Sequence, residues 1–158
     1  MKSPALTALN HKIPPPILTV AMGGLMWLTA QTTPRLIVPD EARLAATALL
    51  LIPGLVFLGS GFLAFRRAKT TINPVNIHAA SNLVTAGVFR ISRNPMYVGL
   101  AALLTAWACY LSAPYCLIGV AVFVLFIRQF QIFPEEQAMR DKFGSAFEAY
   151  QQRVRRWL

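Results

Sequence analysis

The stretch LAATALLLIPGLVFLGSGFLAF, residues 44–65, contains no charged side chain. A helix that crosses a bilayer needs about 20 consecutive, mainly apolar residues, so this stretch is long enough. Pro53 and Gly54 lie inside it and are candidates for a kink. Hydrophobic residues make up 56% of the 158 residues and charged residues only 13%, whereas a soluble domain has about 25% charged residues. The sequence therefore predicts an integral membrane protein.

Two further windows without charge flank this stretch. Residues 13–34 form the first, between Lys12 and Arg35. The second, residues 94–127, is too long for one span and is interrupted at Ser112–Pro114, so we expect a tight hairpin of two short helices there. The chain is long enough for one domain. We predict an all-α membrane protein, a single domain over 1–158, with four transmembrane helices near 16–33, 44–65, 95–111 and 114–133 and a cytosolic amphipathic helix over 134–158.

The first span has the general layout of a signal peptide, with Lys2 and Lys12 ahead of an apolar segment. Three prolines open this segment, and LTAQ is a poor cleavage site because such sites carry small residues at fixed spacing. We therefore expect a helix of the mature protein.

The distribution of basic residues predicts the orientation. Four spans place the termini and the loop over residues 66–93 on one side, and that side carries thirteen of the fifteen Lys and Arg residues. Because cytoplasmic loops are enriched in Lys and Arg, we expect both termini in the cytoplasm and the protein in an inner or plasma membrane. The net charge of +9 fits a membrane surface better than nucleic acid, because the basic residues lie beside apolar runs.

The C-terminal segment carries apolar residues at helical spacing. Successive residues of this set are 4, 4, 3, 4 and 3 positions apart, which places them on one face: Met139, Phe143, Phe147, Tyr150, Val154 and Trp157. Two interpretations are open. A helix lying on the membrane surface is favoured by periodicity alone. The alternative is a lid packed over the middle loop.

Polar residues gather in GVFRISRNPMY, residues 87–97. Asn94 and Pro95 fit an N-cap followed by the first helical residue. Arg90 and Arg93 fit snorkelling toward lipid phosphate, and Tyr97 fits an interfacial aromatic belt. These explanations are purely structural and assign no function to the residues. The alternative is that the stretch forms one half of a binding site.

Two acidic residues open the C-terminal segment. Glu135 and Glu136 follow Pro134, a position that the helix dipole favours. A carboxylate there could also hold a ribose hydroxyl or a cationic group. His78, in the middle loop, is a candidate ligand or base. No metal site is expected, and Cys109 and Cys116 fit small core residues better than a disulfide.

Several signatures of other enzyme classes are absent from the sequence: GxGxxG, the P-loop, GxSxG and HExxH. No acidic residue falls inside a predicted span, which argues against an ion-coupled transporter.

Two separated segments carry a resemblance to a known family. LVTAGVFRISRNPMYVGL, residues 83–100, and PEEQAMRDKFGSAFEAYQQRVRRWL, residues 134–158, resemble the isoprenylcysteine carboxyl methyltransferase and phospholipid methyltransferase superfamily, as a bacterial-type member. The resemblance covers roughly residues 70–158, with a helical hairpin between the motifs. The residues that fit the second motif are Glu135, Glu136, Phe143, Gly144, Tyr150 and Arg153.

The resemblance implies a methyltransferase that uses S-adenosyl-L-methionine at the cytosolic face, with a lipid, lipidated or small hydrophobic substrate entering from the bilayer. The cofactor contacts that it implies are Ser81, Asn82, Leu83, Val84, Phe89, Asn94, Pro95, Met96, Tyr97, Glu135 and Glu136. No catalytic residue is assigned, and the candidates are Arg128, Gln131 and His78.

Two departures weaken the case for a prenylcysteine carboxylate substrate. The prenylcysteine branch has His-Pro where this chain has Asn94-Pro95, and an Arg at the position of Gln131. Arg128 lies nearly one helical turn earlier and could replace that Arg. Two other functions stay open: an NADPH-dependent membrane reductase of sterol-type substrates, against which the short chain argues, and a non-enzymatic four-helix membrane interaction protein. Cofactor binding separates the three.

Overall fold

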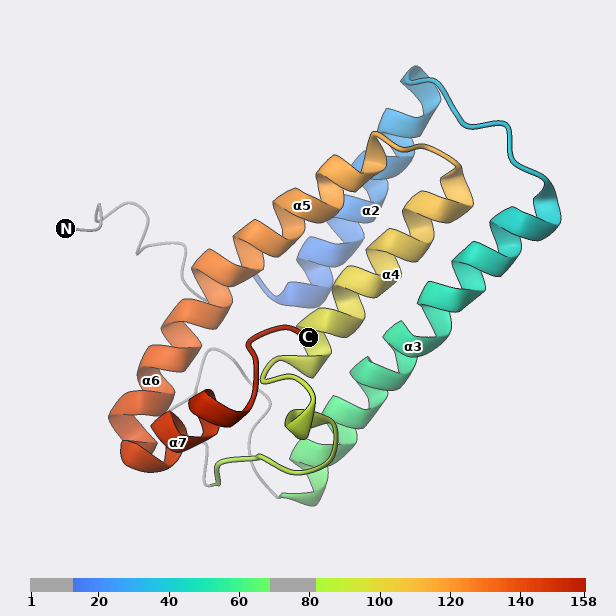
Figure 1. Cartoon of the computed structure of the whole chain (residues 1–158). Coiled ribbons are helices and arrows are strands. Elements are labelled where there is room, and N and C mark those ends of the chain that lie inside the picture. The colour runs from blue at the N-terminus through green and yellow to red at the C-terminus, as the bar shows by residue number, and fades with distance from the viewer. Residues whose placement is uncertain (1–12, 69–81) are drawn as a thin grey trace, which may run out of the picture.

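The computed structural model describes residues 13–68 and 82–158, and within them it contains helices and no strand, which confirms the all-α prediction. Helices α2, α3, α4 and α5 lie side by side, and α6 and α7 extend from one end of this bundle (Figure 1). The elements are α2 Pro15–Thr32, α3 Asp40–Arg67, the 3-10 turn η2 Gly87–Arg90, α4 Pro95–Leu111, α5 Cys116–Ile127, the π-helical turn η3 Arg128–Ile132, α6 Phe133–Phe143 and α7 Ser145–Arg153.

Two helices in the described part of the chain are long and apolar enough to cross a membrane. They are α3 and the continuous helix Cys116–Phe143, with mean hydropathies of 2.2 and 2.1 over their most apolar windows. Helix α4 is a shorter apolar helix. Many large apolar side chains of α3 are exposed, including Leu49 at 75% and Val56 at 57%. An exposed apolar surface of this kind suits contact with lipid, because in water it would be unfavourable.

The turn between α4 and α5 is the predicted hairpin. Helix α4 ends at Leu111, and Ser112 adopts a left-handed backbone conformation with φ of 52°. The Ser112 N–H donates to the Cys109 carbonyl at 3.0 Å, which closes the end of the helix. Both cysteines are free thiols. Cys116 is buried as expected for a core residue, with its Sγ 3.2 Å from the Met26 carbonyl, whereas Cys109 is only partly buried.

Glycines set the close approach of α3 and α4. A Cβ added at Gly99 would lie 2.7 Å from the Gly54 carbonyl oxygen and 2.9 Å from the Leu58 backbone nitrogen. The Met96 side chain packs directly against Gly61, where an added Cβ would lie 2.6 Å from the Met96 Cγ. Small residues that let backbones approach are typical of helix pairs in membranes. The contact fixes the start of α4, where the polar residues lie.

We expect Gly99→Ala to destabilise the protein by about 1–3 kcal/mol, because the added methyl group would meet backbone atoms that cannot move independently. Thermal unfolding in detergent measures the effect. Gly59→Ala is the matched control, since Gly59 lies on α3 with open space around its Cβ position. Equal stability of the two variants would contradict this packing.

The prediction of one amphipathic helix over 134–158 is wrong. The helix that begins at α5 runs through η3 and continues past Pro134 to Phe143. Pro134 closely follows the π-helical turn, which shifts the hydrogen bonds of the continuous helix so that the Phe133 N–H donates to the Arg128 carbonyl. Gly144, with φ of 49°, reverses the chain into α7, and Val154 then begins an extended segment.

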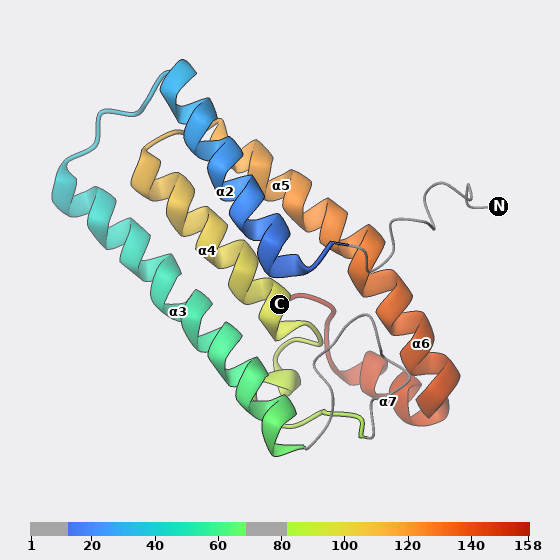
Figure 2. The ribbon, with the colours of Figure 1, turned by 180° about the vertical axis from the view of Figure 1, so that it is seen from behind.

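The favoured interpretation of the C-terminal segment as a helix on the membrane surface is also wrong. Phe147 and Tyr150 of α7 are buried at 4% and 3% exposure and pack with Phe89 of η2. Partly buried apolar residues surround this cluster. They come from the end of α3, the segment around η2, helix α6 and the tail: Ala64, Phe65, Leu83, Val84, Val88, Met139, Phe143 and Val154. The apolar face therefore covers the described part of the middle loop, and Figure 2 shows α7 beside that loop from behind.

Candidate functional site

The two motifs that the sequence separates meet at one hydrogen bond. Tyr97 lies in the first turn of α4 and Glu135 in the first turn of α6. The Tyr97 hydroxyl donates to Glu135 Oε1 at 2.5 Å, and Tyr97 is buried at 8% exposure. The Tyr97 hydroxyl therefore bonds within the protein, which the interpretation of Tyr97 as a residue of an interfacial belt did not include. This bond links the polar segment before α4 to the acidic pair after the hairpin.

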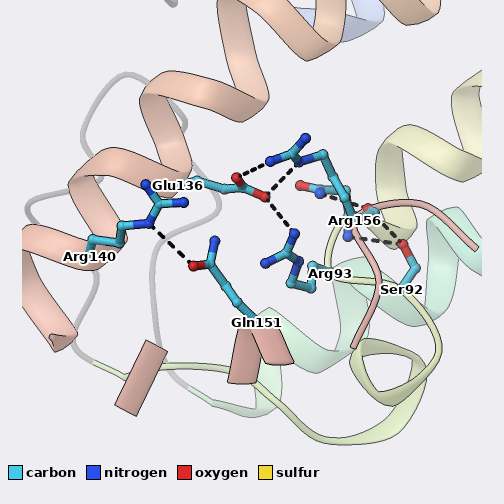
Figure 3. A network of polar contacts seen from close by, with 7 residues as sticks. Ser92, Arg93, Glu136, Arg140, Gln151 and Arg156 are labelled. Carbon is cyan, nitrogen blue, oxygen red and sulfur yellow. Dashed lines mark hydrogen bonds and ion pairs between the residues drawn. The ribbon is translucent and has the colours of Figure 1, made fainter. Parts of the chain in front are cut away.

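The second acidic residue belongs to a buried ion-pair network (Figure 3). Glu136 is exposed by only 6%, and its carboxylate receives Arg156 in a bidentate manner, with Nε 3.0 Å from Oε1 and Nη2 2.7 Å from Oε2. Arg93 Nη2 lies 3.1 Å from the same Oε1. Burial lowers the pKa of the Arg93 guanidinium, and Glu136 acts in the opposite direction, so the carboxylate favours the charged form of this arginine. Arg93 points to protein and not to lipid phosphate.

The extended tail pairs with the segment before α4. The Arg93 backbone N–H donates to the Arg155 carbonyl at 2.9 Å, and the Asn94 side-chain amide donates to the Arg156 carbonyl at 2.9 Å. Ser92, fully buried, accepts from the Asn94 backbone N–H at 3.1 Å. Asn94 precedes α4 as expected, but its side chain makes no capping hydrogen bond. Its amide holds the tail instead.

A third contact ties α7 to η2. The Tyr150 hydroxyl donates to the Phe89 carbonyl at 2.7 Å. Burial raises the pKa of Tyr150 to about 12, although nearby Arg93 lowers it. The phenol is therefore neutral at physiological pH and remains a donor.

Replacing Tyr150 with phenylalanine should lower stability by about 1 kcal/mol near neutral pH, because the Phe89 carbonyl loses this donor. The folded pKa of about 12 exceeds the value of about 10 for an unfolded tyrosine. The stabilisation from the neutral phenol is thus fully present below about pH 10 and is lost as the pH rises toward 12. Unfolding of both proteins across this range should show the difference narrowing, and a constant difference would contradict the assignment.

The other residues implied as cofactor contacts that the structure describes lie near the same end of the bundle, where most of them pack against the protein itself. The Asn82 side-chain amide donates to the Ala68 carbonyl at 3.1 Å. Leu83 and Val84 pack against Phe147 and Tyr150, and Phe89 meets the Phe65 ring edge-on at 5.3 Å. Pro95 is buried, and Met96 packs on Gly61. Ser81 and His78 lie outside the described residues.

Two candidates for catalysis have structural contacts. Gln131 is fully buried, and its Nε2 donates to the Ile13 carbonyl at 2.9 Å, which holds the chain just ahead of α2. Arg128 stacks over the Phe133 ring at 5.4 Å, and Arg156 stacks over the same ring at 4.9 Å. The described residues contain no cluster of His, Cys, Asp or Glu that could hold a metal ion.

Sequence reasoning did not identify Ser92 and Arg156 as part of this arrangement. The sequence contains one indirect indication of Arg156. A buried carboxylate requires a cation, and the C-terminal segment has few acidic residues but several arginines. No local pattern in the sequence selects Arg156 over Arg153 or Arg155. Ser92 carries no signal of its own.

Comparisons with known proteins agree with the resemblance. The sequence model of the phospholipid methyltransferase family matches residues 42–146, about two thirds of the chain, and this range includes Tyr97, Glu135 and Glu136. An uncharacterized protein of Haemophilus influenzae is 44% identical over 63 residues, which are 40% of this chain and the whole of that protein. No solved structure matches this chain.

Proposed function

Because this chain belongs to the phospholipid methyltransferase family, we propose that it is a membrane enzyme that transfers a methyl group from S-adenosylmethionine to a lipid, a lipidated molecule or a small hydrophobic substrate. The observation that carries this proposal is the hydrogen bond between Tyr97 and Glu135. It joins the two segments on which cofactor binding is expected, although 38 residues separate them in the chain.

The residues present fit this cofactor. A carboxylate offers about four acceptor positions, so Glu135 can keep the Tyr97 bond and still accept from a ribose hydroxyl or an ammonium group. Glu135 is less deeply buried than Glu136, which is a buried residue. Tyr97, Glu135 and the backbone of residues 94–96 would hold the polar parts, with Leu83 and Val84 as apolar walls. When bound, S-adenosylmethionine supplies an electrophilic methyl group on its sulfonium.

The protein itself would then position the cofactor and the substrate and exclude water from them. The pairing of the tail with residues 92–94 and the packing of α7 on η2 hold the two motifs in a fixed relation. Correct orientation of two reactants alone contributes up to about 7–11 kcal/mol to lowering a barrier. An apolar substrate would reach the site from the bilayer along the exposed helix faces.

The network also limits the choice of a base. Glu136 is held by two arginines, so accepting a proton would cost two ion pairs. We therefore assign Glu136 to structure and Glu135 to the cofactor. A nucleophile that is already deprotonated, such as a carboxylate or a thiolate, needs no base. An amine would require one, and His78 stays a candidate.

For the membrane arrangement we propose four crossings, by α2, α3, α4 and the helix that begins at α5, with both termini in the cytoplasm. The support is the placement of the basic residues on the side of the termini and the middle loop. A reporter fused after Leu158 should read as cytoplasmic, and a signal from the opposite side would contradict this orientation.

Titration calorimetry with S-adenosylhomocysteine tests the proposed function on the full chain purified in detergent. We expect saturable binding of this product analogue and no binding of NADPH. Binding of NADPH alone would favour the membrane reductase, and binding of neither would favour the non-enzymatic interaction protein.

A further inference from the structure

Two adjoining cavities lie away from the candidate site, toward the end of the bundle that holds the Ser112–Pro114 turn. We call this the hairpin end. Figure 1 shows the end of α2, the start of α3 and the α4–α5 turn together there. Tyr97 and Trp107 are ten residues apart on α4, about 15 Å along the helix axis, so these cavities are separate from the Tyr97–Glu135 bond.

The first cavity, which we call the head cavity, carries two arginines. It has a volume of about 420 Å³ and is lined by Arg35 and Arg43 together with Trp107 and Tyr110. Arg43 stacks over the Tyr110 ring at 5.5 Å, and that ring stacks on Trp107. This head cavity therefore combines positive charge with an aromatic wall.

Within the described residues, the two head-cavity arginines use only some of their hydrogen-bond donors in contacts with the protein. Arg35 Nε donates to the Ala30 carbonyl at 2.8 Å and its Nη2 to Gln31 at 3.1 Å. Arg43 Nη2 lies 2.9 Å from Asp40, while its buried Nε has no hydrogen-bond partner among the described residues. A guanidinium offers five donors, so both side chains retain donors for an anion. Asp40 is largely exposed to solvent and offsets only one of the two charges.

The second cavity is an apolar groove between α2 and α4. It has a volume of about 480 Å³, and its walls include Val20, Gly23, Gly24, Leu103 and Leu104. Gly23 and Gly24 open the groove, because nothing lies within 4 Å of a Cβ added at either position. Its length from Thr19 to Trp27 is about 12 Å along α2.

The two cavities adjoin, because Trp27 and Trp107 line both of them. A cavity with two arginines beside an apolar groove matches a molecule with an anionic head and an aliphatic tail. We propose that one anionic phospholipid of the adjacent leaflet binds here, with its phosphate beside Arg35 and Arg43 and one acyl chain in the groove at Gly23 and Gly24. This lipid site is distinct from the proposed methyl-transfer site.

The two cavity tryptophans provide a direct readout. The chain contains three tryptophans, so a Trp157→Phe background leaves Trp27 and Trp107 as the emitters. We would add phosphatidylglycerol with brominated acyl chains, which quench nearby tryptophans, to this protein in detergent micelles. Phosphatidylcholine with the same chains lacks the net negative charge. We expect half-quenching by phosphatidylglycerol at a roughly tenfold lower mole fraction, as one charge-assisted hydrogen bond would give.

Variants with matched controls locate the site. Arg43→Gln should remove the preference for phosphatidylglycerol, whereas Arg66→Gln should keep it, although Arg66 also lies over an aromatic ring at the other end of α3. Gly24→Leu should weaken quenching by both lipids, because it fills the groove. Gly59→Leu makes the same change at another open position and should leave quenching unaltered.

Three results would overturn the lipid site. The first is equal quenching by the two lipids in the protein that retains Arg43. The second is unchanged quenching in Gly24→Leu, which is expected to fold because the added side chain enters open space. The third is loss of the phosphatidylglycerol preference on adding millimolar inorganic phosphate, which would identify a site for free phosphate.

Discussion

Replacing Glu136 with alanine is expected to destabilise the protein by about 3–5 kcal/mol, the effect of removing one partner of a buried ion pair. The side chains of Glu136 and Arg93 are exposed by only 7% and 10%, and Arg156 by 26%. Without the carboxylate, two guanidinium groups would face each other with no anion between them. Thermal unfolding in detergent measures the loss, with helix content followed by circular dichroism.

The matched control is Glu148→Ala, because Glu148 lies on the exposed side of α7 in the same segment. It should change the stability by less than about 0.5 kcal/mol, as surface substitutions usually do. If the two variants unfold at the same temperature, the network does not hold the tail against the segment before α4.

Sequence patterns predict the parts of this fold that depend on local properties. The charge-free stretch over 44–65 corresponds to the body of α3, and the interruption at Ser112–Pro114 corresponds to the turn before α5. A run of apolar residues and a turn residue are properties of neighbouring positions, so they can be recognised without a structure.

The C-terminal segment shows where this reasoning fails. Its apolar residues repeat at helical spacing across Gly144, and the same spacing is compatible with one helix or with two helices around a glycine. The glycine itself is the signal that the sequence offers, because glycine commonly follows the end of a helix, and in the structure Gly144 has a positive φ. The surface that the apolar face covers depends on contacts distant in the chain, since Phe89 lies 61 residues before its partner Tyr150. Local spacing does not reveal such contacts.

Asn94 illustrates the same limit for a polar side chain. A preference for the N-cap position correctly places it before α4, but its amide bonds to Arg156, 62 residues away. This contact changes how a substitution is interpreted. Asn94→Asp would remove the donor to the tail carbonyl as well as any donor to a cofactor, so loss of binding in that variant would not by itself locate the cofactor.

The acidic pair has two roles because of helix geometry. Adjacent residues of an α-helix point about 100° apart around its axis. Glu135 therefore faces Tyr97 while Glu136 faces Arg93 and Arg156. The pair is a single feature in the sequence, but in the structure Glu136 binds two arginines and Glu135 accepts a hydrogen bond from Tyr97, which is why we propose only Glu135 for the cofactor.

This division leads to the second expected result. Glu135→Ala should weaken binding of S-adenosylhomocysteine by tenfold or more, because a charge-assisted hydrogen bond contributes about 1.5–3 kcal/mol and 1.4 kcal/mol corresponds to tenfold. Its effect on stability should be smaller than that of Glu136→Ala, since Glu135 is partly exposed and faces no arginine network. Calorimetry and thermal unfolding of the same preparations separate the two effects.

Tyr97→Phe and Asp141→Ala complete this test. Tyr97→Phe should weaken binding in the unmodified chain but have little further effect after Glu135→Ala, because the Tyr97 hydroxyl donates to Glu135 and so contributes to the site mainly by positioning that carboxylate. Asp141 lies on the same helix α6, is exposed and accepts a hydrogen bond from Gln137. Asp141→Ala should therefore bind as the unmodified protein does. Equal, small losses in Glu135→Ala and Asp141→Ala would mean that Glu135 serves the start of α6 and holds no cofactor. A large loss in Glu135→Ala alone, with the fold retained, would place the cofactor at the point where the two motifs meet.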